Sequence, residues 1–353
     1  MQPPQAISKT PERCPYCAGS KLTRRGRRQK KLEYVQLWRC KSCSHTFTPE
    51  LAKGKSYPTR LIVDALAWYH QGHSKDETLR RIRRKYHQAP ADSTFWKWLA
   101  DYEDICSYRR MRLSLRQEFT PHRLIRSVKL YHQQVYKYSI HYGKLSALQR
   151  EGNNDQRIPN LAAYLEEMRQ HCRHELFTEE AKGSRASKLK GTFNLAGVSV
   201  SAKENAATET ARFVLSTVAN NRIRHEALQR FMLQCDSATV ATEVPIALLP
   251  EDIEAFRRSG FKVPIHTDHP ITGHVDFLQI RNGAIHILDY KPDARTNRPV
   301  DQLTLYALAL SRAAGLRLYD YKCACFNEEG YYEFFPLHVV HKRPPVKPEI
   351  DAW

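Results

Sequence analysis

Charged side chains end two strand-like segments within residues 273–291. The first segment places Asp276 between two apolar neighbours, and the second is largely apolar over 284–288 before it ends in Asp289 and Lys291. Carboxylates on adjacent strands can converge on one hard divalent cation, which prefers oxygen ligands. A neighbouring lysine can stabilise negative charge that develops on a reacting group. The pattern therefore indicates a metal-dependent active site.

A short turn between the two segments predicts that they form a β-hairpin. Residues 281–283 read Arg-Asn-Gly, and Asn-Gly between apolar segments is a strong signal for a hairpin turn. A buried strand needs no charged ending for its stability, so the charges at both ends indicate chemistry. Tyr290, between the two charged residues of the second strand, can add its main-chain carbonyl as a further cation ligand.

Four more polar residues lie in neighbouring predicted elements. His225 is part of a helical pattern over 211–233, and Glu243 lies in the segment expected to form the first strand of the domain. Gln302 and Tyr306 are four residues apart on a further predicted helix, so they share one of its faces. Strands expected over 319–326 and 331–337 would complete a sheet.

These residues resemble the motifs of the PD-(D/E)XK nuclease superfamily, and in particular its RecB-like and CRISPR-associated exonuclease-like branch. The resemblance covers about 205–340. It rests on His225, Glu243, Gly273-x-x-Asp276, Asp289-Tyr290-Lys291 and Gln302-x-x-x-Tyr306.

The resemblance implies an α/β restriction-endonuclease-like fold for residues 186–340. It also implies Mg²⁺- or Mn²⁺-dependent hydrolysis of DNA phosphodiester bonds. The metal ligands that it implies are Asp276, Asp289, Tyr290 and His225. Gln302 and Tyr306 would support the DNA and the active-site Lys291. Glu243 is open between two roles, a further metal-site carboxylate or a residue that supports the ligands.

An iron–sulfur cluster, which many relatives in the RecB-like branch carry, is not expected here. The branch has one cysteine before the core and three after it, whereas only Cys323 and Cys325 follow the hairpin and Cys172 and Cys235 precede it. Cys323 and Cys325 are interpreted as strand residues that point to opposite faces. We therefore predict no cluster.

Two Cys-x-x-Cys pairs near the N-terminus predict a structural zinc site. They are separated by 22 residues and comprise Cys14, Cys17, Cys40 and Cys43. Four thiolates on two tight turns suit a tetrahedral Zn²⁺ ion. A strand-like segment lies between them, so residues 10–50 are expected to form a zinc ribbon. A redox dithiol is the alternative, but it would need one pair rather than two.

Three helices are expected over residues 56–105, at 58–71, at 77–86 behind a capping box, and from residue 93 onward. With the zinc ribbon before them, they resemble the helix-turn-helix domains of transposases and resolvases. Trp96 and Trp98 cannot share a helix face, so one should be buried and the other exposed. The expected DNA-backbone contacts are Arg81, Arg83, Arg84, Lys85 and Lys97. An ordinary solvated basic face is the alternative for these residues.

The rest of the chain divides into a helical connector over 106–185 and a C-terminal tail over 341–353. Residues 181–187 read as a linker between the connector and the C-terminal domain. Tyrosines alternate with lysines within the connector, and core packing is favoured there over contact with nucleic acid.

Basic residues are concentrated in the first part of the chain. The net charge is +19, and residues 1–150 hold 31 Lys and Arg against 11 Asp and Glu. This imbalance indicates a nucleic-acid partner, because phosphate neutralisation supplies most non-specific affinity. Neither a signal peptide nor a membrane-spanning segment is expected. Nine cysteines without an export signal indicate a reducing compartment, and we expect a cytoplasmic protein.

The sequence therefore predicts a multidomain α+β protein: a small zinc ribbon, a helical helix-turn-helix domain and connector, and a C-terminal α/β nuclease fold. The expected activity is that of a metal-dependent deoxyribonuclease in a prokaryotic mobile-element or defence setting, with DNA and transposition or defence proteins as partners. A homodimer is left open. The alternatives are a sequence-specific DNA-binding factor that uses its nuclease-like domain for assembly, and a nuclease that acts on RNA.

Overall fold

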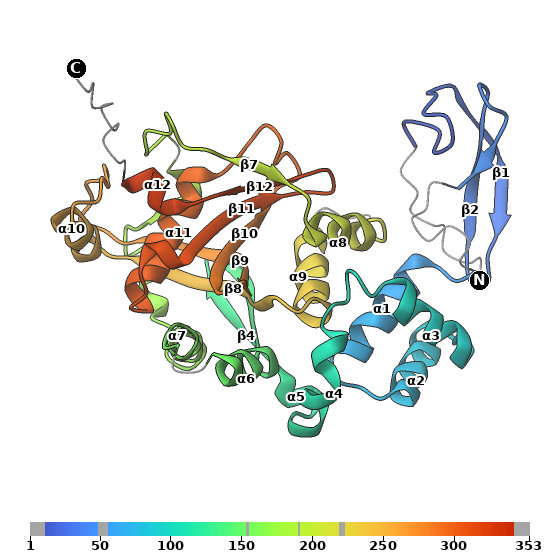
Figure 1. Cartoon of the computed structure of the whole chain (residues 1–353), viewed down its shortest axis with the longest axis horizontal. Coiled ribbons are helices and arrows are strands. Elements are labelled where there is room, and N and C mark those ends of the chain that lie inside the picture. The colour runs from blue at the N-terminus through green and yellow to red at the C-terminus, as the bar shows by residue number, and fades with distance from the viewer. Residues whose placement is uncertain (1–10, 49–55, 153–154, 190, 219–222, 342–353) are drawn as a thin grey trace, which may run out of the picture.

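Three regions follow one another along the long axis of the molecule (Figure 1). The computed structural model describes residues 11–48, 56–152, 155–189, 191–218 and 223–341. A small sheet lies at one end, a group of short helices follows it, and a large mixed sheet with helices on both faces forms the other end. Of the expected tail, residues 342–353 lie outside the described residues. No helix in the described ranges is long and apolar enough to cross a membrane.

The N-terminal region is a three-stranded antiparallel sheet. Its strands are β1 (Leu22–Gln29), β2 (Tyr34–Cys40) and β3 (Thr46–Phe47), in that order. Its small core contains Trp38, Phe47 and two cysteines, Cys14 and Cys40. Because so little apolar area is buried, a further cross-link is expected to contribute to the stability of this region.

The three helices expected over residues 56–105 are present as α1 (Thr59–His70), α2 (Lys75–Tyr86) and α3 (Asp92–Asp101). Ser74 caps α2, and its hydroxyl accepts a 3.1 Å hydrogen bond from the main-chain N–H of Glu77. Trp98 is 2% exposed and packs in the core, whereas Trp96 is 46% exposed. The prediction that the two tryptophans differ in burial is therefore confirmed.

The group formed by α1, α2 and α3, called the helical module below, packs directly on the C-terminal region. One hydrophobic cluster contains residues of α1, of α8 (Ala206–Leu215), of α9 (Arg224–Cys235) and of the large sheet. Asp64 of α1 forms an ion pair with Arg230 of α9, in which Oδ1 of Asp64 lies 3.1 Å from the guanidinium nitrogen, and it also forms an ion pair with Lys85 of α2. The two regions therefore share a core. Burial in this part of the molecule lowers the pKa of His70, the last residue of α1, to about 4.

The large sheet has nine strands within the described residues. Its order is β4-β5-β8-β9-β10-β11-β12-β7, with β6 beside β9. The strands are β4 (Ile125–His132), β5 (Gln134–His141), β6 (Ser184–Arg185), β7 (Ser201–Lys203), β8 (Thr239–Leu248), β9 (Ile271–Arg281), β10 (Ala284–Tyr290), β11 (Tyr321–Phe326) and β12 (Tyr331–Phe334). β9 and β10 form the expected antiparallel hairpin, and Asn282 and Gly283 both have positive φ at its turn.

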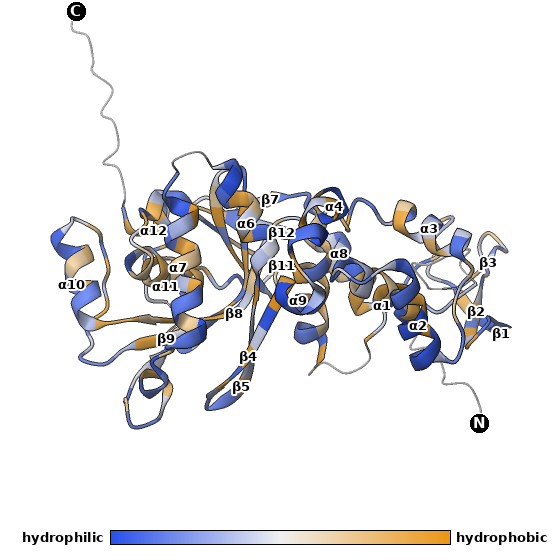
Figure 2. Cartoon of the chain, turned by 90° about the horizontal axis from the view of Figure 1, so that it is seen from below, coloured by the Kyte–Doolittle hydropathy of each residue, from blue (hydrophilic) through white to orange (hydrophobic). Residues whose placement is uncertain are grey.

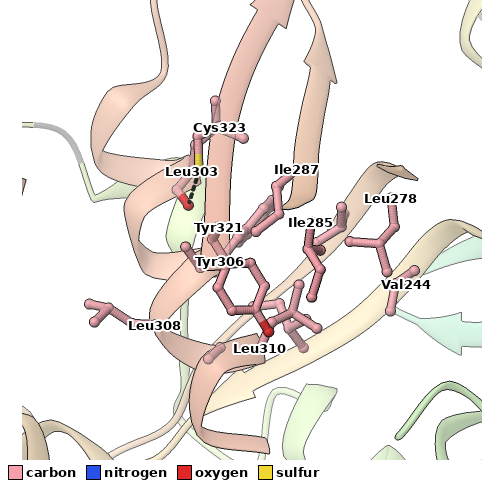
Figure 3. Packing of buried hydrophobic residues seen from close by; sticks show 14 of the residues in the cluster. Val244, Leu278, Ile285, Ile287, Leu303, Tyr306, Leu308, Leu310, Tyr321 and Cys323 are labelled. Atoms are coloured by element: carbon pink, nitrogen blue, oxygen red, sulfur yellow. Dashed lines mark hydrogen bonds between the residues drawn. The ribbon is translucent and has the colours of Figure 1, made fainter. Parts of the chain in front are cut away.

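Helices cover both faces of this sheet. One face carries α6 (Tyr142–Glu151), α7 (Arg157–Gln170), α11 (Val300–Ala313) and α12 (Pro336–Val340), and the other carries α8, α9 and α1. α11 connects β10 to β11, which lie parallel and therefore need a crossover. Figure 3 shows Leu303 and Tyr306 of α11 against Ile285, Ile287 and Cys323 of the strands. Shorter helices are α4 (Arg109–Glu118), α5 (Pro121–Leu124) and α10 (Pro250–Arg258).

The prediction of a helical connector is wrong for residues 125–141, which form β4 and β5. Tyrosine, valine and isoleucine favour a pleated surface, and this signal was outweighed by an apparent helical spacing of apolar residues. β5 pairs with β8 at Ser139 and Ile140, so these strands extend the large sheet. The β4–β5 hairpin projects from the body of the molecule (Figure 2).

The expected linker at 181–187 is also wrong, because it is packed against the sheet. β6 pairs with β9 in parallel, and a short helical turn, Ala186–Lys188, follows with Ala186 1% exposed. A Cβ atom at Gly183 would lie 2.7 Å from the carbonyl oxygen of Pro270. Gly183 is therefore required for close packing of the main chain, although its sequence context suggested flexibility.

Two smaller predictions also need correction. The helical pattern over 211–233 is divided into α8 and α9, and residues 219–222 between them lie outside the described residues. Cys323 and Cys325 do not point to opposite faces, since both belong to the same hydrophobic cluster. Residues two apart on a strand lie on the same face. The Cys323 thiol contacts the carbonyl oxygen of Leu303 at 3.4 Å (Figure 3).

Candidate active site

Three carboxylates lie side by side on three neighbouring strands. Glu243 is on β8, Asp276 on β9 and Asp289 on β10. The ladder pairs on either side of them are Thr242–Phe277, Val244–Val275 and Leu288–Phe277. This register places Glu243 opposite Asp276, and Asp289 just beyond the end of the β9–β10 ladder. Like charges directly opposite one another are destabilising, so the cluster needs a cation or protons.

Asp276 is held by groups on both of its sides. The main-chain N–H of Tyr290 donates a 3.2 Å hydrogen bond to its Oδ2, and Nδ1 of His225, at the start of α9, lies 3.4 Å from the same oxygen. His225 is therefore brought to the carboxylates, as expected from the sequence. Burial lowers the pKa of His225, which favours the neutral imidazole that can bind a metal.

Asp289 lies between Lys291 and α11. Nζ of Lys291 is 3.1 Å from its Oδ2, and Nε2 of Gln302 donates a 3.3 Å hydrogen bond to its Oδ1. Gln302 also donates to the hydroxyl of Tyr306 at 3.0 Å. Oδ2 is buried and accepts no hydrogen bond in the described part of the chain, so the contact with Lys291 is an ion pair without hydrogen-bond geometry. Lone pairs on this oxygen stay available.

Burial sets the protonation of the whole cluster. It raises the pKa of Asp276 to about 6. Burial, together with the charge of Asp276, raises the pKa of Asp289 to about 7 and that of Glu243 to about 8. Burial alone would lower the pKa of Lys291, but the carboxylates of Asp289 and Asp276 outweigh it and the net direction is upward. The lysine is therefore charged, whereas the carboxylates share protons in the absence of a cation.

Glu243 is held in a strained backbone conformation. Its φ is +53°, in the left-handed region that non-glycine residues rarely adopt. Nε2 of Gln229 on α9 donates a 2.7 Å hydrogen bond to its Oε1 and lies 3.4 Å from the main-chain oxygen of Asp276. Strain of this kind persists only where the surroundings hold it, and it is common at functional sites. Gln229 was not predicted from the sequence.

Gly273 allows α11 to approach β9. A Cβ atom at this position would lie 2.4 Å from Cε1 of Tyr306, which no side chain could occupy without displacing the ring. The two motifs thus meet in one packing contact. Gly273 of the Gly-x-x-Asp motif lies against Tyr306 of the Gln-x-x-x-Tyr motif. Gln302, held by Tyr306, is placed against Asp289 as a result.

The carboxylates open into a pocket of about 610 Å³. Besides the predicted residues, its wall includes Tyr136 and Lys137 of β5 together with Arg185 and Lys188. Arg185 pairs with the hydroxyl of Tyr136, and the ring of Tyr136 stacks on His274 at 3.6 Å. Lys137 and Arg185 were not predicted because they lie in segments interpreted as connector and linker, and Lys188 directly follows the segment interpreted as the linker. The alternation of lysine and tyrosine over 129–138 was the one available signal.

A comparison with known families agrees with this geometry. The family model of the PD-(D/E)XK nuclease superfamily matches residues 140–332. The chain belongs to the PD-(D/E)XK nuclease superfamily. The matched range begins in β5 and includes all eight residues predicted for the active site. No curated protein and no solved structure gives a significant match to the chain.

The donor set of this PD-(D/E)XK nuclease domain fits a hard divalent cation. Three carboxylates converge, one buried carboxylate oxygen accepts no hydrogen bond in the described ranges, and a neutral imidazole lies beside them. Oxygen-rich sites of this kind suit Mg²⁺ and Mn²⁺. Ionised carboxylates so close together in a buried site would otherwise repel one another, and a bound cation removes that cost.

Outside the nuclease domain, the four N-terminal cysteines come together. Their sulfur atoms all lie within 4.8 Å of one another, with Cys14–Cys43 and Cys17–Cys40 each at 3.6 Å. Main-chain N–H groups, that of Cys43 first, lower the pKa of the Cys40 thiol to about 6. This arrangement has the donor set of a four-thiolate metal site.

The basic residues predicted to contact DNA lie mainly on exposed surface. Arg83, Arg84 and Lys97 are exposed on α2 and α3. Arg81 is half-buried and pairs with Glu77 at 3.0 Å, and Lys85, although half-exposed, pairs with Asp64. Arg83, Arg84 and Lys97 therefore keep their charge available to solvent, whereas Arg81 forms an ion pair within α2 and Lys85 forms one between α2 and α1.

Proposed function

We propose that the chain is a DNA-binding nuclease that hydrolyses phosphodiester bonds with the help of Mg²⁺ or Mn²⁺. The observation that carries this proposal is the cluster of Glu243, Asp276 and Asp289 beside Lys291, in a pocket lined by further basic residues. Such a cluster is costly in an apo protein, and it fits a function in which cations and phosphates are both bound.

Each residue of the site has a role that follows from its position. When bound, the divalent cation would polarise the scissile phosphate and lower the pKa of a water molecule. Asp276, Asp289 and the carbonyl of Tyr290 would hold it, and His225 would be a further ligand. Lys291 stabilises negative charge as it develops on the phosphate and orients the attacking water. Gln302 fixes the orientation of Asp289 through its 3.3 Å hydrogen bond.

Glu243 is assigned to the metal site as a third carboxylate. The hydrogen bond from Gln229 on α9 holds its side chain in the pocket that Asp276 and Asp289 also line. The raised pKa of Glu243, due to burial and to Asp276, means that it binds a proton near neutrality unless a cation is present. Glu243 would therefore release its proton when a cation binds, and its carboxylate would then become a ligand of that cation.

The N-terminal regions would deliver this domain to DNA. We assign a structural Zn²⁺ to the four cysteines of residues 14–43, and we assign α1, α2 and α3 to a helix-turn-helix unit. Exposed Arg83, Arg84 and Lys97 would contact the DNA backbone. We place the nuclease in the RecB-like branch and, with its zinc ribbon, in a cytoplasmic mobile-element or defence setting.

The proposal is tested by incubating the full chain with linear duplex, closed circular and single-stranded DNA in the presence of Mg²⁺ or Mn²⁺. We expect cleavage that EDTA abolishes, and cleavage of the closed circle would identify an endonuclease. An RNA strand of the same sequence should be cut more slowly. Absence of cleavage of every DNA form with both cations would contradict the proposal.

A further inference from the structure

A second group of metal-ligand side chains lies far from the carboxylates, where the helical module meets the nuclease domain. It consists of His70 at the end of α1, Cys106 after α3, and Cys235 at the end of α9. One ligand atom of each residue lies within 4.8 Å of those of the other two. All three residues are 0% exposed. Three segments far apart in the sequence thus converge on one dry point.

The tautomer of His70 leaves a lone pair directed into the protein interior. Its Nδ1 lies 2.7 Å from the carbonyl oxygen of Leu66, which can only accept, so Nδ1 carries the proton. Its Nε2 is buried and has no hydrogen-bond partner in the described part of the chain. Buried polar atoms without a partner are rare. Histidines that bind metals commonly donate their other ring N–H to a carbonyl in this way.

The main chain fixes the two cysteines beside this lone pair. The N–H of Cys106 donates to the carbonyl of Tyr102 at 3.0 Å, and the carbonyl of Cys235 accepts from the N–H of Tyr108 at 3.0 Å. The hydroxyls of Ser107 and Ser237, next in the chain after Cys106 and near Cys235, are 3.0 Å apart. Both thiols are therefore held at a rigid junction between two regions.

Another group with similar composition does not share this property. His132 lies 2.8 Å from His274 through Nδ1 and 2.8 Å from His174 through Nε2, with Cys172 at 3.9 Å. Both ring nitrogens of His132 are already engaged by hydrogen bonds, so this group is explained by packing and hydrogen bonding. Nδ1 of His274 and Nε2 of His141 are also buried without a partner in the described ranges, but only His70 of these three lies in a group of metal-ligand side chains, beside two thiols.

We propose that His70, Cys106 and Cys235 bind a structural zinc ion that joins the helical module to the nuclease domain. Thiolate and imidazole ligands select zinc over the hard cations of the carboxylate site. Two thiolates and one neutral imidazole bring the formal charge of the complex to zero, which removes much of the cost of burying a cation. Three protein ligands fill three of the four tetrahedral positions of a zinc ion.

This zinc would also support the active site, through α9. His225 stands near the start of that helix and Cys235 at its end, and ten residues correspond to about 15 Å along a helix axis. Gln229, which holds Glu243, lies between them. Zinc at Cys235 therefore fixes the far end of the helix that presents His225 and Gln229. The proposed site stands on His70 and the two cysteines alone and does not depend on nuclease activity.

Native mass spectrometry of the full chain counts bound zinc directly. The Asp289→Asn background excludes zinc bound adventitiously at the carboxylates. We expect two zinc ions per chain, one of which is lost with Cys14→Ser and Cys40→Ser and the other with Cys106→Ser and Cys235→Ser. Cys323→Ser is the matched control, since that buried cysteine belongs to neither group, and it should retain both ions.

A second measurement avoids any substitution in the buried group. X-ray absorption on a chain with Cys14→Ser, Cys17→Ser, Cys40→Ser, Cys43→Ser and Asp289→Asn, which keeps no thiol of the N-terminal group, should show the remaining zinc with two sulfur ligands at about 2.3 Å and nitrogen or oxygen ligands at about 2.0–2.1 Å. The proposal is overturned if this chain holds no zinc, or if its zinc has no sulfur ligand. A chain that loses all zinc with the two N-terminal substitutions would overturn it equally.

Discussion

The protonation of the carboxylate cluster predicts opposite effects of pH on the free chain and on the cation-bound chain. Burial raises the pKa of Asp289 to about 7 and that of Asp276 to about 6, well above their values in an unfolded chain. A group whose pKa is raised by folding stabilises the fold at low pH, and this contribution is lost as pH rises through the folded value. The free chain should therefore lose stability between about pH 4, where these carboxyls ionise in an unfolded chain, and about pH 7, where they are ionised in the folded chain as well.

A bound divalent cation should reverse this trend. With a pKa of about 7, Asp289 is about one-tenth ionised at pH 6 and about nine-tenths ionised at pH 8. The affinity for the cation should then rise about tenfold over this range from Asp289 alone, which corresponds to about 1.4 kcal/mol. Through linkage, the increase in Tm caused by saturating cation should be about 3–5 °C larger at pH 8 than at pH 6.

Differential scanning fluorimetry at several pH values, with EDTA or with Mn²⁺, measures this difference. Asp289→Asn should flatten both curves, because it removes the group with a pKa near 7. Asp104→Asn, a change at an exposed carboxyl far from the pocket, should follow the unmodified chain. A cation-induced shift of equal size at pH 6 and pH 8, or no shift at all, would refute the reasoning.

Three further predictions address the supports of the site and the DNA surface. Glu243→Gln should raise the Tm of the cation-free chain at pH 8.5 by a few degrees, because it removes roughly 1 kcal/mol of repulsion between Glu243 and the neighbouring carboxylates. The same change should reduce the rate of DNA cleavage. A lower Tm would contradict the assigned repulsion. Gly273→Ala should lower both the Tm and the rate of cleavage, because the added Cβ would lie 2.4 Å from the ring of Tyr306. Adding Tyr306→Leu to this variant should restore part of the Tm. An unchanged Tm for Gly273→Ala alone would count against this contact. Arg83→Ala combined with Arg84→Ala should weaken DNA binding and lower the slope of log K against log salt by about two. Lys262→Ala, a change at an exposed lysine of the C-terminal region, is the control and should leave the affinity and the slope unchanged. Equal salt slopes for the unmodified chain, the double variant and the control would exclude this surface.

The hairpin and the charged end of its second strand were predictable because their signals are local, whereas Asp276 lies in the middle of β9 rather than at its end. Asn282 and Gly283 determine the turn, and alternation determines which residues face the interior. Asp289 and Lys291 follow directly from the end of an apolar segment. The family motifs then linked these residues to Gln302 and Tyr306, which the structure brings into one hydrogen-bonded group.

Other parts of the site depend on tertiary contacts that a sequence does not contain. Arg185 lies in a segment with the composition of a linker, and only its pairing with β9 brings it to the pocket. The positive φ of Glu243 is rare for a residue other than glycine, and Gln229 matters only because its side chain on α9 reaches Glu243. Local propensity cannot foresee such contacts.

The shared core between α1 and α9 was likewise not visible in the sequence. Composition suggested a separate basic module, because the charge changes sharply after residue 150. The apolar face of α1 instead packs in the same cluster as α8 and α9. Deleting residues 1–105 would therefore expose part of the nuclease core, and single substitutions on the exposed face of α2 are the appropriate test of DNA binding.

The most direct test of the central claim is the rate of DNA cleavage by Lys291→Ala and Asp289→Asn chains in Mg²⁺ or Mn²⁺. We predict that both lose cleavage by at least about a hundredfold, the loss typical when one electrostatic group is removed from an active site, while DNA binding in EDTA stays close to that of the unmodified chain. Lys262→Ala and Asp104→Asn serve as matched controls and should cut normally. Cleavage by the Lys291→Ala and Asp289→Asn chains at the rate of the controls would contradict the assignment of the active site.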